Sequence, residues 1–208
     1  VKLYNNKTSY LIDEKDSLTN VPANTRYEET DTRKIYRRTT TTATFDGKSE
    51  NDQTDTYDDD IRGEQIQTGH ALIGKVITSI TLKAQRGGTT GTYKLGLFNA
   101  TGVLQHQFKT ASISTLSSSY AEVTGNDLGS GDTTADRTVG TNYIIGMTNS
   151  GDTNNRVQLR QSTTAGRANE IQGKCAAAGS SFVAGGENAD LYMEVSYVDE
   201  VWKERNTA

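Results

Sequence analysis

The chain is poor in cysteine, proline and tryptophan, each of which occurs once among 208 residues. Because Cys175 is alone, no internal disulfide can form and no cysteine-based metal site can be built. No apolar run approaches the roughly 18 residues that a membrane-spanning helix needs. Amphipathic helical periods and long leucine-rich stretches are missing as well. These absences exclude a disulfide scaffold and a transmembrane helix, and they argue against an α/β fold.

Positive charge is also scarce. The 22 Lys and Arg residues against 26 Asp and Glu give a net charge of -4, and the pI is about 5.3. A nucleic-acid-binding domain normally presents a basic face. The one basic run, Arg33, Lys34, Arg37 and Arg38, follows closely on acidic residues. We therefore expect neither nucleic acid nor membrane insertion in the function of this chain.

Apolar residues make up only 33% of the chain, and the mean hydropathy is -0.67. This is little for a core at this length, and it suits a sandwich that is one side-chain layer deep with two wet outer faces. Threonine is abundant, and its β-branched side chain favours strands. The composition therefore predicts an all-β fold.

The stretch 74–102, GKVITSITLKAQRGGTTGTYKLGLFNATG, carries the clearest strand pattern. Apolar and polar residues alternate on both sides of a turn-rich RGGTTG break. The apolar positions are Ile80, Leu82 and Ala84 before the break and Tyr93, Leu95 and Leu97 after it. Alternation on both sides of a glycine turn is typical of a half-buried antiparallel pair. We predict that this stretch is the central hairpin of the sandwich.

Further short strands are predicted at 103–108, in TNYIIGMTNS, in RVQLRQS and in the closing LYMEVSYVDEV. Many short strands at about ten-residue spacing indicate an antiparallel β-sandwich of the jelly-roll kind. We predict that this sandwich covers 46–200, after an extended N-terminal arm at 1–45 and before a polar tail at 201–208.

The arm at 1–45 is too polar to bury a core of its own, and isolated hairpins are marginal in water. It is either a flexible leader or an arm that becomes ordered against a neighbouring molecule, and we expect the second, with another copy of the chain as the neighbour. The expected contact residues are the apolar and aromatic ones of the arm and the single tryptophan: Leu3, Tyr4, Tyr10, Leu11, Ile12, Tyr27, Ile35, Tyr36 and Trp202.

An acidic stretch at 46–60, DGKSENDQTDTYDDD, reads as a turn-forming loop that is dense in oxygen ligands. Carboxylates at this density suit a calcium ion, although the spacing is not that of an EF-hand. The candidate ligands of a structural calcium are Asp52, Asp55, Asp58, Asp59, Asp60, Glu64 and Asp190. A solvated acidic loop is the alternative.

No catalytic motif stands out, and we expect no enzymatic activity. Carboxylate pairs for a glycosidase exist on paper in any acidic chain. No G-x-S-x-G nucleophile elbow is present, so His70 and His106 are interpreted as surface histidines. A carbohydrate-binding face remains an alternative, since Tyr57, Tyr120, Phe182 and Trp202 are candidate aromatic platforms.

From 62 to 197 the chain resembles a broad class of jelly-roll domains found in phage and archaeal-virus appendages and in secreted proteins. The matching pieces are IRGEQ, the 74–102 stretch, TNYIIGMTNSGD and ADLYMEVSY. Members of this class often carry a proline before the Thr-Gly of the turn, where this chain has GGTTG. The segment TRYEETDTRKIYRR is similar to short β-modules of phage tail and structural proteins. The resemblance implies a fold and an extracellular or virion setting, and the structural calcium near an early loop and the last strand follows from it.

We therefore predict a non-enzymatic structural subunit that self-assembles through its N-terminal arm. An extended arm can add a strand to a neighbour's sheet edge, and repetition of that contact makes rings or filaments. A virion surface component and an extracellular filament both fit, with a homo-oligomer as the main partner and other virion proteins or cell-surface glycans as further ones. The alternative function is a lectin-like carbohydrate-binding module.

Overall fold

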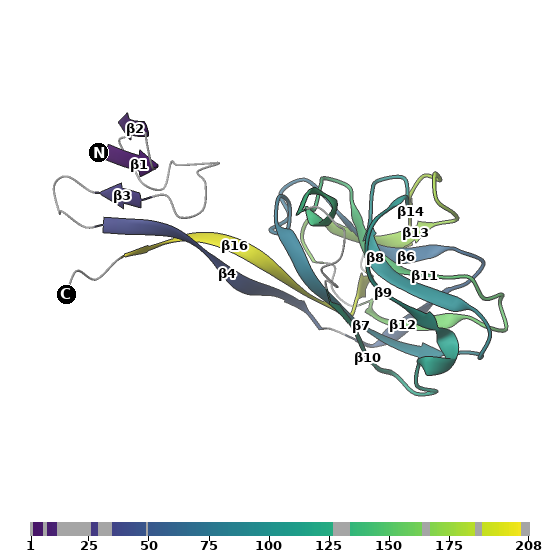
Figure 1. Cartoon of the computed structure of the whole chain (residues 1–208). Helices are drawn as coiled ribbons and strands as arrows, with labels where there is room; N and C mark the ends of the chain where they lie inside the picture. The colour runs from purple at the N-terminus through teal and green to yellow at the C-terminus, as the bar shows by residue number, and fades with distance from the viewer. Residues whose placement is uncertain are drawn as a thin grey trace. The chain divides into compact units, whose positions relative to one another are not determined.

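The computed structural model describes residues 2–5, 8–11, 26–28, 35–48, 50–126, 134–163, 167–185 and 189–204. The chain divides into two compact units (Figure 1). Unit 1 comprises Val1–Ala43 with Val198–Ala208, and unit 2 is Thr44–Tyr197. The first boundary lies two residues from the predicted end of the arm.

The described residues form strands joined by turns, with two short 3-10 helices, η2 (Ile113–Thr115) and η3 (Thr134–Arg137). The strands are β1 (Lys2–Asn5), β2 (Thr8–Leu11), β3 (Arg26–Glu28), β4 (Ile35–Gly47), β5 (Asp52–Thr56), β6 (Ile61–Ile66), β7 (Val76–Arg86), β8 (Thr92–Phe98), β9 (Leu104–Ser112), β10 (Ala121–Asn126), β11 (Ile144–Asn149), β12 (Val157–Ser162), β13 (Glu170–Cys175), β14 (Val183–Ala184), β15 (Asp190–Leu191) and β16 (Met193–Glu204). No helix in the described part of the chain is long and apolar enough to cross a membrane.

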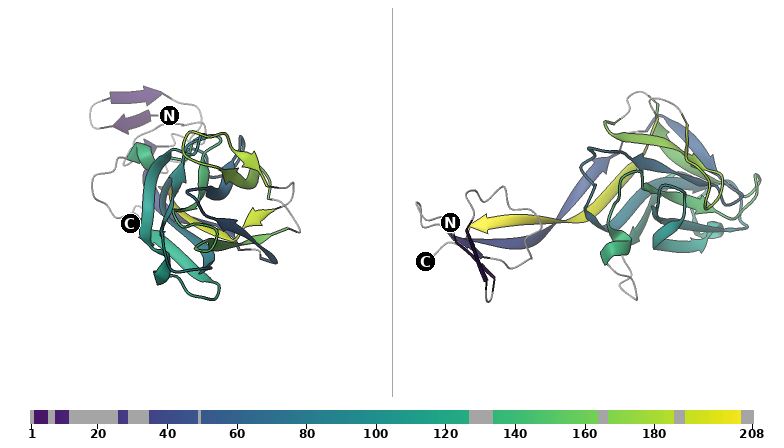
Figure 2. Two further views of the ribbon diagram at one scale, coloured as in Figure 1. Left: turned by 90° about the vertical axis from the view of Figure 1, so that its right-hand side faces the viewer. Right: turned by 90° about the horizontal axis from the view of Figure 1, so that it is seen from above.

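Unit 2 is a sandwich of two antiparallel sheets (Figure 2). One sheet has the strand order β14-β13-β6-β11-β8-β9. The other has the order β15-β12-β7-β16-β4, with β10 paired to β7 and β5 paired to β12. This confirms the all-β sandwich and is compatible with a jelly-roll-like fold.

In unit 1, β4 is followed in the sheet by β3, β1 and β2. All the pairs between these four strands are antiparallel. Strands β4 and β16 each contribute residues to both units. Val201–Glu204 therefore belong to β16, and not to a separate polar tail.

The core lies between the two sheets and follows the alternation of the sequence. The apolar positions predicted in 74–102 are all buried in one cluster with the closing strand, whose Leu191, Met193 and Val195 are also fully buried. Phe45 and Tyr197 pack against this cluster from β4 and β16. Polar residues between these positions account for much of the low apolar content, although the six-stranded sheet also buries a smaller apolar cluster on its other face.

The predicted central hairpin is wrong, because β7 and β8 belong to different sheets. β7 pairs with β10 and β12, whereas β8 pairs with β9 and β11. The segment 87–91 crosses between the sheets, and it is held by the loop before β12 through Gly87 N–H to the Arg156 carbonyl at 2.9 Å. Alternation shows that each strand has one buried face, but it does not show which strand lies beside it.

One further prediction changes. The acidic stretch, expected to be a loop, contains a strand, β5, which pairs with β12 along its whole length. The preceding TTTTATF is part of the 13-residue β4.

A row of four glycines crosses the six-stranded sheet. Gly146 on β11 is the direct partner of Gly96 on β8 and of Gly63 on β6, and Gly63 is the partner of Gly173 on β13. A Cβ on Gly146 would lie 2.2 Å from the carbonyl oxygen of Arg62. The row lets the neighbouring large side chains fold over it. They form a second apolar cluster of Ile61, Phe98, Ile144 and Cys175, against which Leu104 and Phe182 pack.

Candidate functional site

The predicted contact residues of unit 1 fall into register across four strands. Tyr10 is the partner of Leu3, Leu3 of Tyr27, and Tyr27 of Tyr36, so these four occupy one row from β2 to β4. Three tyrosines and a leucine therefore occupy consecutive positions of one register row. Spacing alone could not have shown this, because the row pairs residues as far apart in the chain as Leu3 and Tyr27.

The other predicted contact residues lie elsewhere. Leu11 and Ile35 occupy the two ends of the neighbouring row, which carries Lys2 and Glu28 between them. Tyr4 lies in the row on the other side, opposite Ser9 and Arg26. Trp202 is in β16, and Ile12 lies outside the residues that the structure describes.

Among the described strands, β2 ends the sheet with β1 as its one neighbour, and its own sequence carries neither charge nor a bulge. Its residues, Thr-Ser-Tyr-Leu, carry no charge and no proline, and its four pairs with β1 run without a bulge. Natural sheets usually protect an edge by shortness, charge or a bulge. Among the other described strands with one strand neighbour, β14 and β15 are two residues long, and β9 has two register shifts. β5 carries two aspartates, and β10 carries Glu122.

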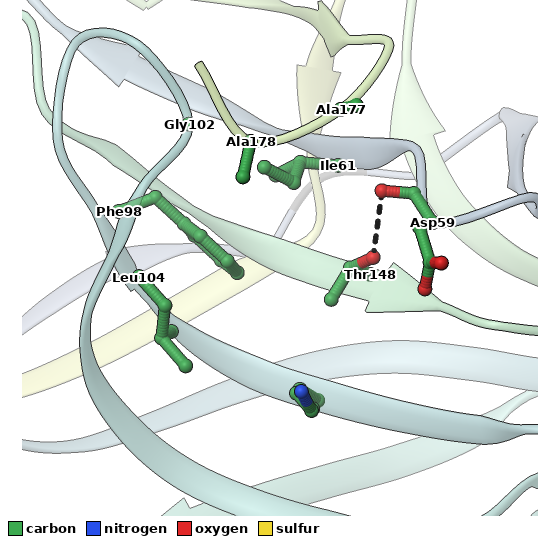
Figure 3. Close-up of a pocket in the computed structure, with 9 residues that line it drawn as sticks. Asp59, Ile61, Phe98, Gly102, Leu104, Thr148, Ala177 and Ala178 are labelled. Carbon is green, nitrogen blue, oxygen red and sulfur yellow. Dashed lines mark hydrogen bonds between the residues drawn. The ribbon is translucent and has the colours of Figure 1, made fainter.

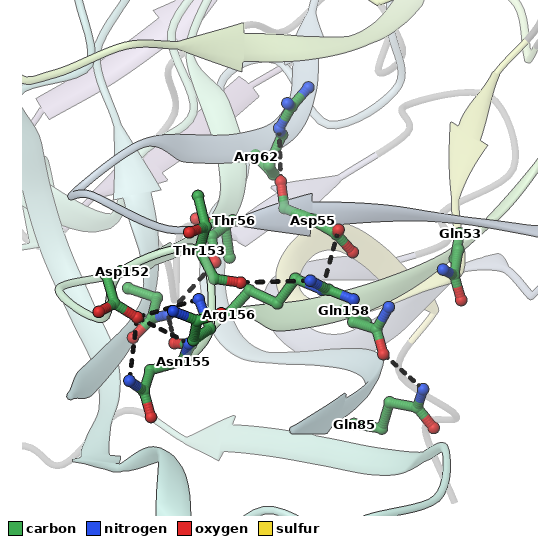
Figure 4. Close-up of polar contacts among 12 residues, drawn as sticks. Gln53, Asp55, Thr56, Arg62, Gln85, Asp152, Thr153, Asn155, Arg156 and Gln158 are labelled. Atoms are coloured by element: carbon green, nitrogen blue, oxygen red, sulfur yellow. Dashed lines mark hydrogen bonds and ion pairs between the residues drawn. The ribbon is translucent and has the colours of Figure 1, made fainter. Parts of the chain in front are cut away.

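The acidic residues proposed as calcium ligands are divided among several places in unit 2. Asp52 accepts from Gln161 Nε2 at 3.3 Å, and Asp55 Oδ2 lies 3.2 Å from Arg156 Nε (Figure 4). Asp58 and Asp59 are exposed in a turn with positive φ. Asp60 lies 3.8 Å from Lys174 Nζ.

Glu64 and Asp190, in contrast, come together in the interior with a third carboxylate that the sequence analysis did not select, Glu170. Glu64 accepts a hydrogen bond from the Leu191 N–H, and Asp190 Oδ2 accepts one from the Arg167 N–H at 2.6 Å. The Arg167 side chain donates to Glu170 from Nε, to the Gly47 carbonyl at 2.8 Å and to the Leu191 carbonyl at 3.1 Å. One guanidinium thus joins the end of β4, the start of β13 and β15. We call these four side chains the Arg167 cluster.

His70 borders the Arg167 cluster from the turn after β6. Its Nδ1 accepts from the Leu72 N–H at 3.1 Å, which places the proton of the neutral ring on Nε2. Nε2 faces Glu170 Oε2 at 3.8 Å. The ring also packs edge-on against Phe45, with centroids 5.0 Å apart. Burial, and then the charge of Arg167, lower the pKa of His70, so it is a neutral neighbour of the cluster.

The three carboxylates of the Arg167 cluster are all harder to ionise than usual. Burial, and then the charge of Glu170, raise the pKa of Glu64 well above its ordinary value. Burial is also the main cause of the raised pKa of Glu170 and of Asp190, against the opposing charge of Arg167. The interior here therefore favours neutral carboxyl groups.

Three polar atoms at this place have no hydrogen-bond partner among the described residues: Glu64 Oε2, Glu170 Oε2 and Gln172 Nε2. Gln172 is the direct strand partner of Glu64. Within the described ranges no three His, Cys, Asp or Glu side chains are arranged to hold a metal ion. Calcium binding at the predicted ligands stays a prediction.

Both histidines were interpreted as surface residues, and that interpretation is wrong. His70 is 6% exposed and His106 is 2% exposed, with its ring 4.5 Å from that of Phe108. His106 lies two positions before Phe108 in β9, and both are buried, so strand alternation places them on one face. The two glutamines beside His106 made this part of the strand look solvent-exposed in the sequence.

A pocket of about 440 Å³ opens on the outer face of the six-stranded sheet (Figure 3). Its apolar wall is formed by Ile61, Phe98 and Leu104. Lys94 and Asp59, both exposed, add charges of opposite sign at its rim. The turns at 99–103 and 176–180 border it, and they are tied together by the Gly179 N–H donating to the Thr101 carbonyl at 2.7 Å. The pocket can accommodate a small amphipathic molecule.

The aromatic residues considered as sugar platforms do not gather at this pocket. The ring of Tyr120 is covered by the guanidinium of Arg160, 4.3 Å from its centroid, and its hydroxyl donates to Gln53 at 2.5 Å. Phe182 packs against the second apolar cluster, and Tyr57 is partly buried. The side-chain position of Trp202 is outside the described set.

Comparison with known proteins gives no relative for this chain: no family model, no curated protein and no solved structure matches it.

Proposed function

We propose that the protein is a non-enzymatic structural subunit that assembles with further copies of itself by strand addition at β2. The observation that carries this proposal is the unprotected edge of β2, in contrast to the short, charged or bulged edges of the other described strands. An open edge pairs readily with another chain, because its backbone groups lack partners on one side.

The row from Tyr10 to Tyr36 supports the same proposal. It aligns three tyrosines and a leucine at successive positions across β2, β1, β3 and β4. A second copy that extended the sheet at β2 would continue this row. The resemblance of the sequence to appendage proteins favours a virion surface structure or an extracellular filament as the product.

Ser9→Pro tests the proposal at one backbone position. The pair Asn5–Thr8 closes the β1–β2 hairpin, so the backbone groups of Thr8 face β1 and those of Ser9 face outward. Proline removes the outward N–H and leaves the pairing to β1. We expect the wild type to form large species by light scattering and negative-stain imaging, and Ser9→Pro to weaken association at least tenfold.

Ser9→Thr is the matched control, since it keeps the N–H and should assemble like the wild type. Assembly of Ser9→Pro at wild-type concentrations would remove strand addition at β2 as the mechanism. A wild type that is monomeric at all concentrations would remove the structural-subunit proposal altogether.

Carbohydrate binding is the second candidate function, and the pocket at Phe98 is the observation that favours it. Its apolar wall and its mixed polar rim could accept a small glycan. The measurement is binding of the whole protein to a glycan array, with Lys94→Ala and Lys109→Ala compared. Loss of binding in Lys94→Ala alone would support the pocket, and equal binding by both variants would exclude it.

A further inference from the structure

The Arg167 cluster contains more negative than positive charge. It holds three carboxylates and one guanidinium, of which Glu170 is hydrogen-bonded to the guanidinium and the other two carboxylates accept backbone N–H groups. Burial lowers the pKa of His70 beside them, so full ionisation of the carboxylates would leave an excess of two negative charges. Glu64 and Asp190 are 0% and 1% exposed, and the Glu170 side chain is fully buried. An uncompensated charge at such a place is costly, and a buried carboxyl group usually takes up a proton instead.

The hydrogen bonds show which carboxyl group is best suited to hold that proton. Glu170 receives the side chain of Arg167, and Asp190 receives its backbone N–H. Glu64 receives one backbone N–H at Oε1, and its Oε2 has no partner in the described chain. A proton on Oε2 would neutralise Glu64, and no existing hydrogen bond would be lost.

The cluster also links several elements of the sandwich. Through the hydrogen bonds of Arg167 it connects residue 47 at the end of β4, Glu170 at the start of β13 and both residues of β15. β15 is separated from β16 by Tyr192 alone. Repulsion inside the cluster would therefore be expected to loosen this corner of the sandwich before the rest.

We propose that the Arg167 cluster is a pH-sensitive clip, closed while Glu64 is protonated and strained open when all three carboxylates ionise. The groups that face Glu64 are Glu170 from β13, Asp190 from β15 and Arg167 from the segment before β13. Its raised pKa agrees with the geometry. This inference does not depend on the proposed assembly at β2.

The direction of the pH dependence follows from linkage. Between the unfolded pKa of a glutamate, about 4.3, and its higher value in the folded protein, the folded state holds a proton that the unfolded state has lost. Raising the pH then favours unfolding. The stabilising contribution of the proton is complete below the unfolded pKa, and it disappears as the pH rises to the folded one.

The test compares the full-length wild type with Glu64→Gln, in which an uncharged amide replaces the carboxyl group at nearly the same volume. Urea unfolding between pH 4.5 and 8 gives the unfolding constant of each protein. We expect the ratio of the wild-type constant to the Glu64→Gln constant to rise with pH, by up to about tenfold per pH unit, as expected for one proton. The pKa values of Glu170, Asp190, His70 and Cys175 are shifted as well, but these residues are common to both proteins.

Hydrogen exchange on the folded protein adds a local readout that does not need unfolding. The amides of Leu191 and Arg167, which donate to Glu64 and Asp190, should lose protection in the wild type as the pH rises and keep it in Glu64→Gln. Glu170→Gln removes the hydrogen-bonded partner of Arg167 and also one of the excess negative charges, so it should lower stability at low pH and show a weaker dependence on pH than the wild type. Glu50→Gln, at an exposed position, is the control, and its unfolding constant should depend on pH as that of the wild type does.

Parallel pH dependence of wild type and Glu64→Gln would overturn the proposal. The proposal would also be overturned if the pH dependence of the wild-type unfolding constant disappeared on addition of calcium and returned with a chelator. The cluster would then be held by a cation and not by a proton.

Discussion

Gly146 has no Cβ, and this allows three strands of the six-stranded sheet to approach one another closely. Its partners on both sides, Gly96 and Gly63, are also glycines, and the carbonyl of Arg62 lies where a Cβ would be. Glycine within a strand interior normally weakens it, and here it marks a close approach of backbones. At this scale one methyl group is enough to disturb the fold.

Gly146→Ala should therefore destabilise unit 2 by about 1–3 kcal/mol, the usual cost of overpacking. Urea unfolding followed by far-ultraviolet circular dichroism measures the loss. Gly87→Ala is the matched control, since its Cβ would meet mainly the flexible side chain of Arg156 and should cost much less. Equal stability of Gly146→Ala and the wild type would show that the strands can separate at no cost.

At the scale of elements, the decisive feature is the crossover between β7 and β8. The segment 87–91 carries the chain from one sheet to the other, and Asn155 holds it by accepting the N–H groups of Thr89 and Thr90 at 3.1 and 3.0 Å. The Asn155 side chain also donates to Asp152 at 2.9 Å (Figure 4). The segment 87–91 looks like a hairpin loop in the sequence, but these hydrogen bonds hold it in a path from one sheet to the other.

Asn155→Ala should leave the two N–H groups of the crossover without their acceptor and also remove the bond to Asp152. We expect a loss of about 1–3 kcal/mol in the free energy of unfolding, since three hydrogen bonds are removed. Gln105→Ala removes a single exposed side-chain bond to the Val103 carbonyl and should change stability little. Indistinguishable urea midpoints for the two variants would mean that Asn155 does not hold the crossover.

At the scale of the whole molecule, the core and the proposed assembly surface belong to different units. The apolar core, the Arg167 cluster and the pocket are all in unit 2. The row of Tyr10, Leu3, Tyr27 and Tyr36 and the edge of β2 are in unit 1. Stability and assembly should accordingly separate when the chain is divided.

The fragment Thr44–Tyr197 should retain one cooperative unfolding transition and the β-sheet spectrum, because it contains the whole buried cluster. It should have lost the ability to form large species. Calorimetry and light scattering on the same sample test the two halves of this prediction. A fragment that folds and still assembles would locate the contact in unit 2, and an unfolded fragment would show that unit 1 is needed for the core.

Alternation of apolar and threonine-rich polar residues was enough to predict strands with one buried face, and so the all-β sandwich and the buried positions from Ile80 to Leu97. This works because the two-residue period of a strand is a local property of the backbone. The density of carboxylates in the acidic stretch suggested one shared site. In the structure Asp52, Asp55 and Asp60 each lie beside a different amide or basic side chain.

The strand neighbours, the buried carboxyl group of Glu64 and the register row of unit 1 were decided only by the tertiary structure. Each depends on residues far apart in the chain, such as Glu64 with Leu191, or Tyr27 with Leu3. Strands pair through backbone groups that are the same in every residue except proline. The residue types therefore say little about which strands pair. The sequence by itself determined which faces are buried, and the three-dimensional packing determined which strands and charges meet.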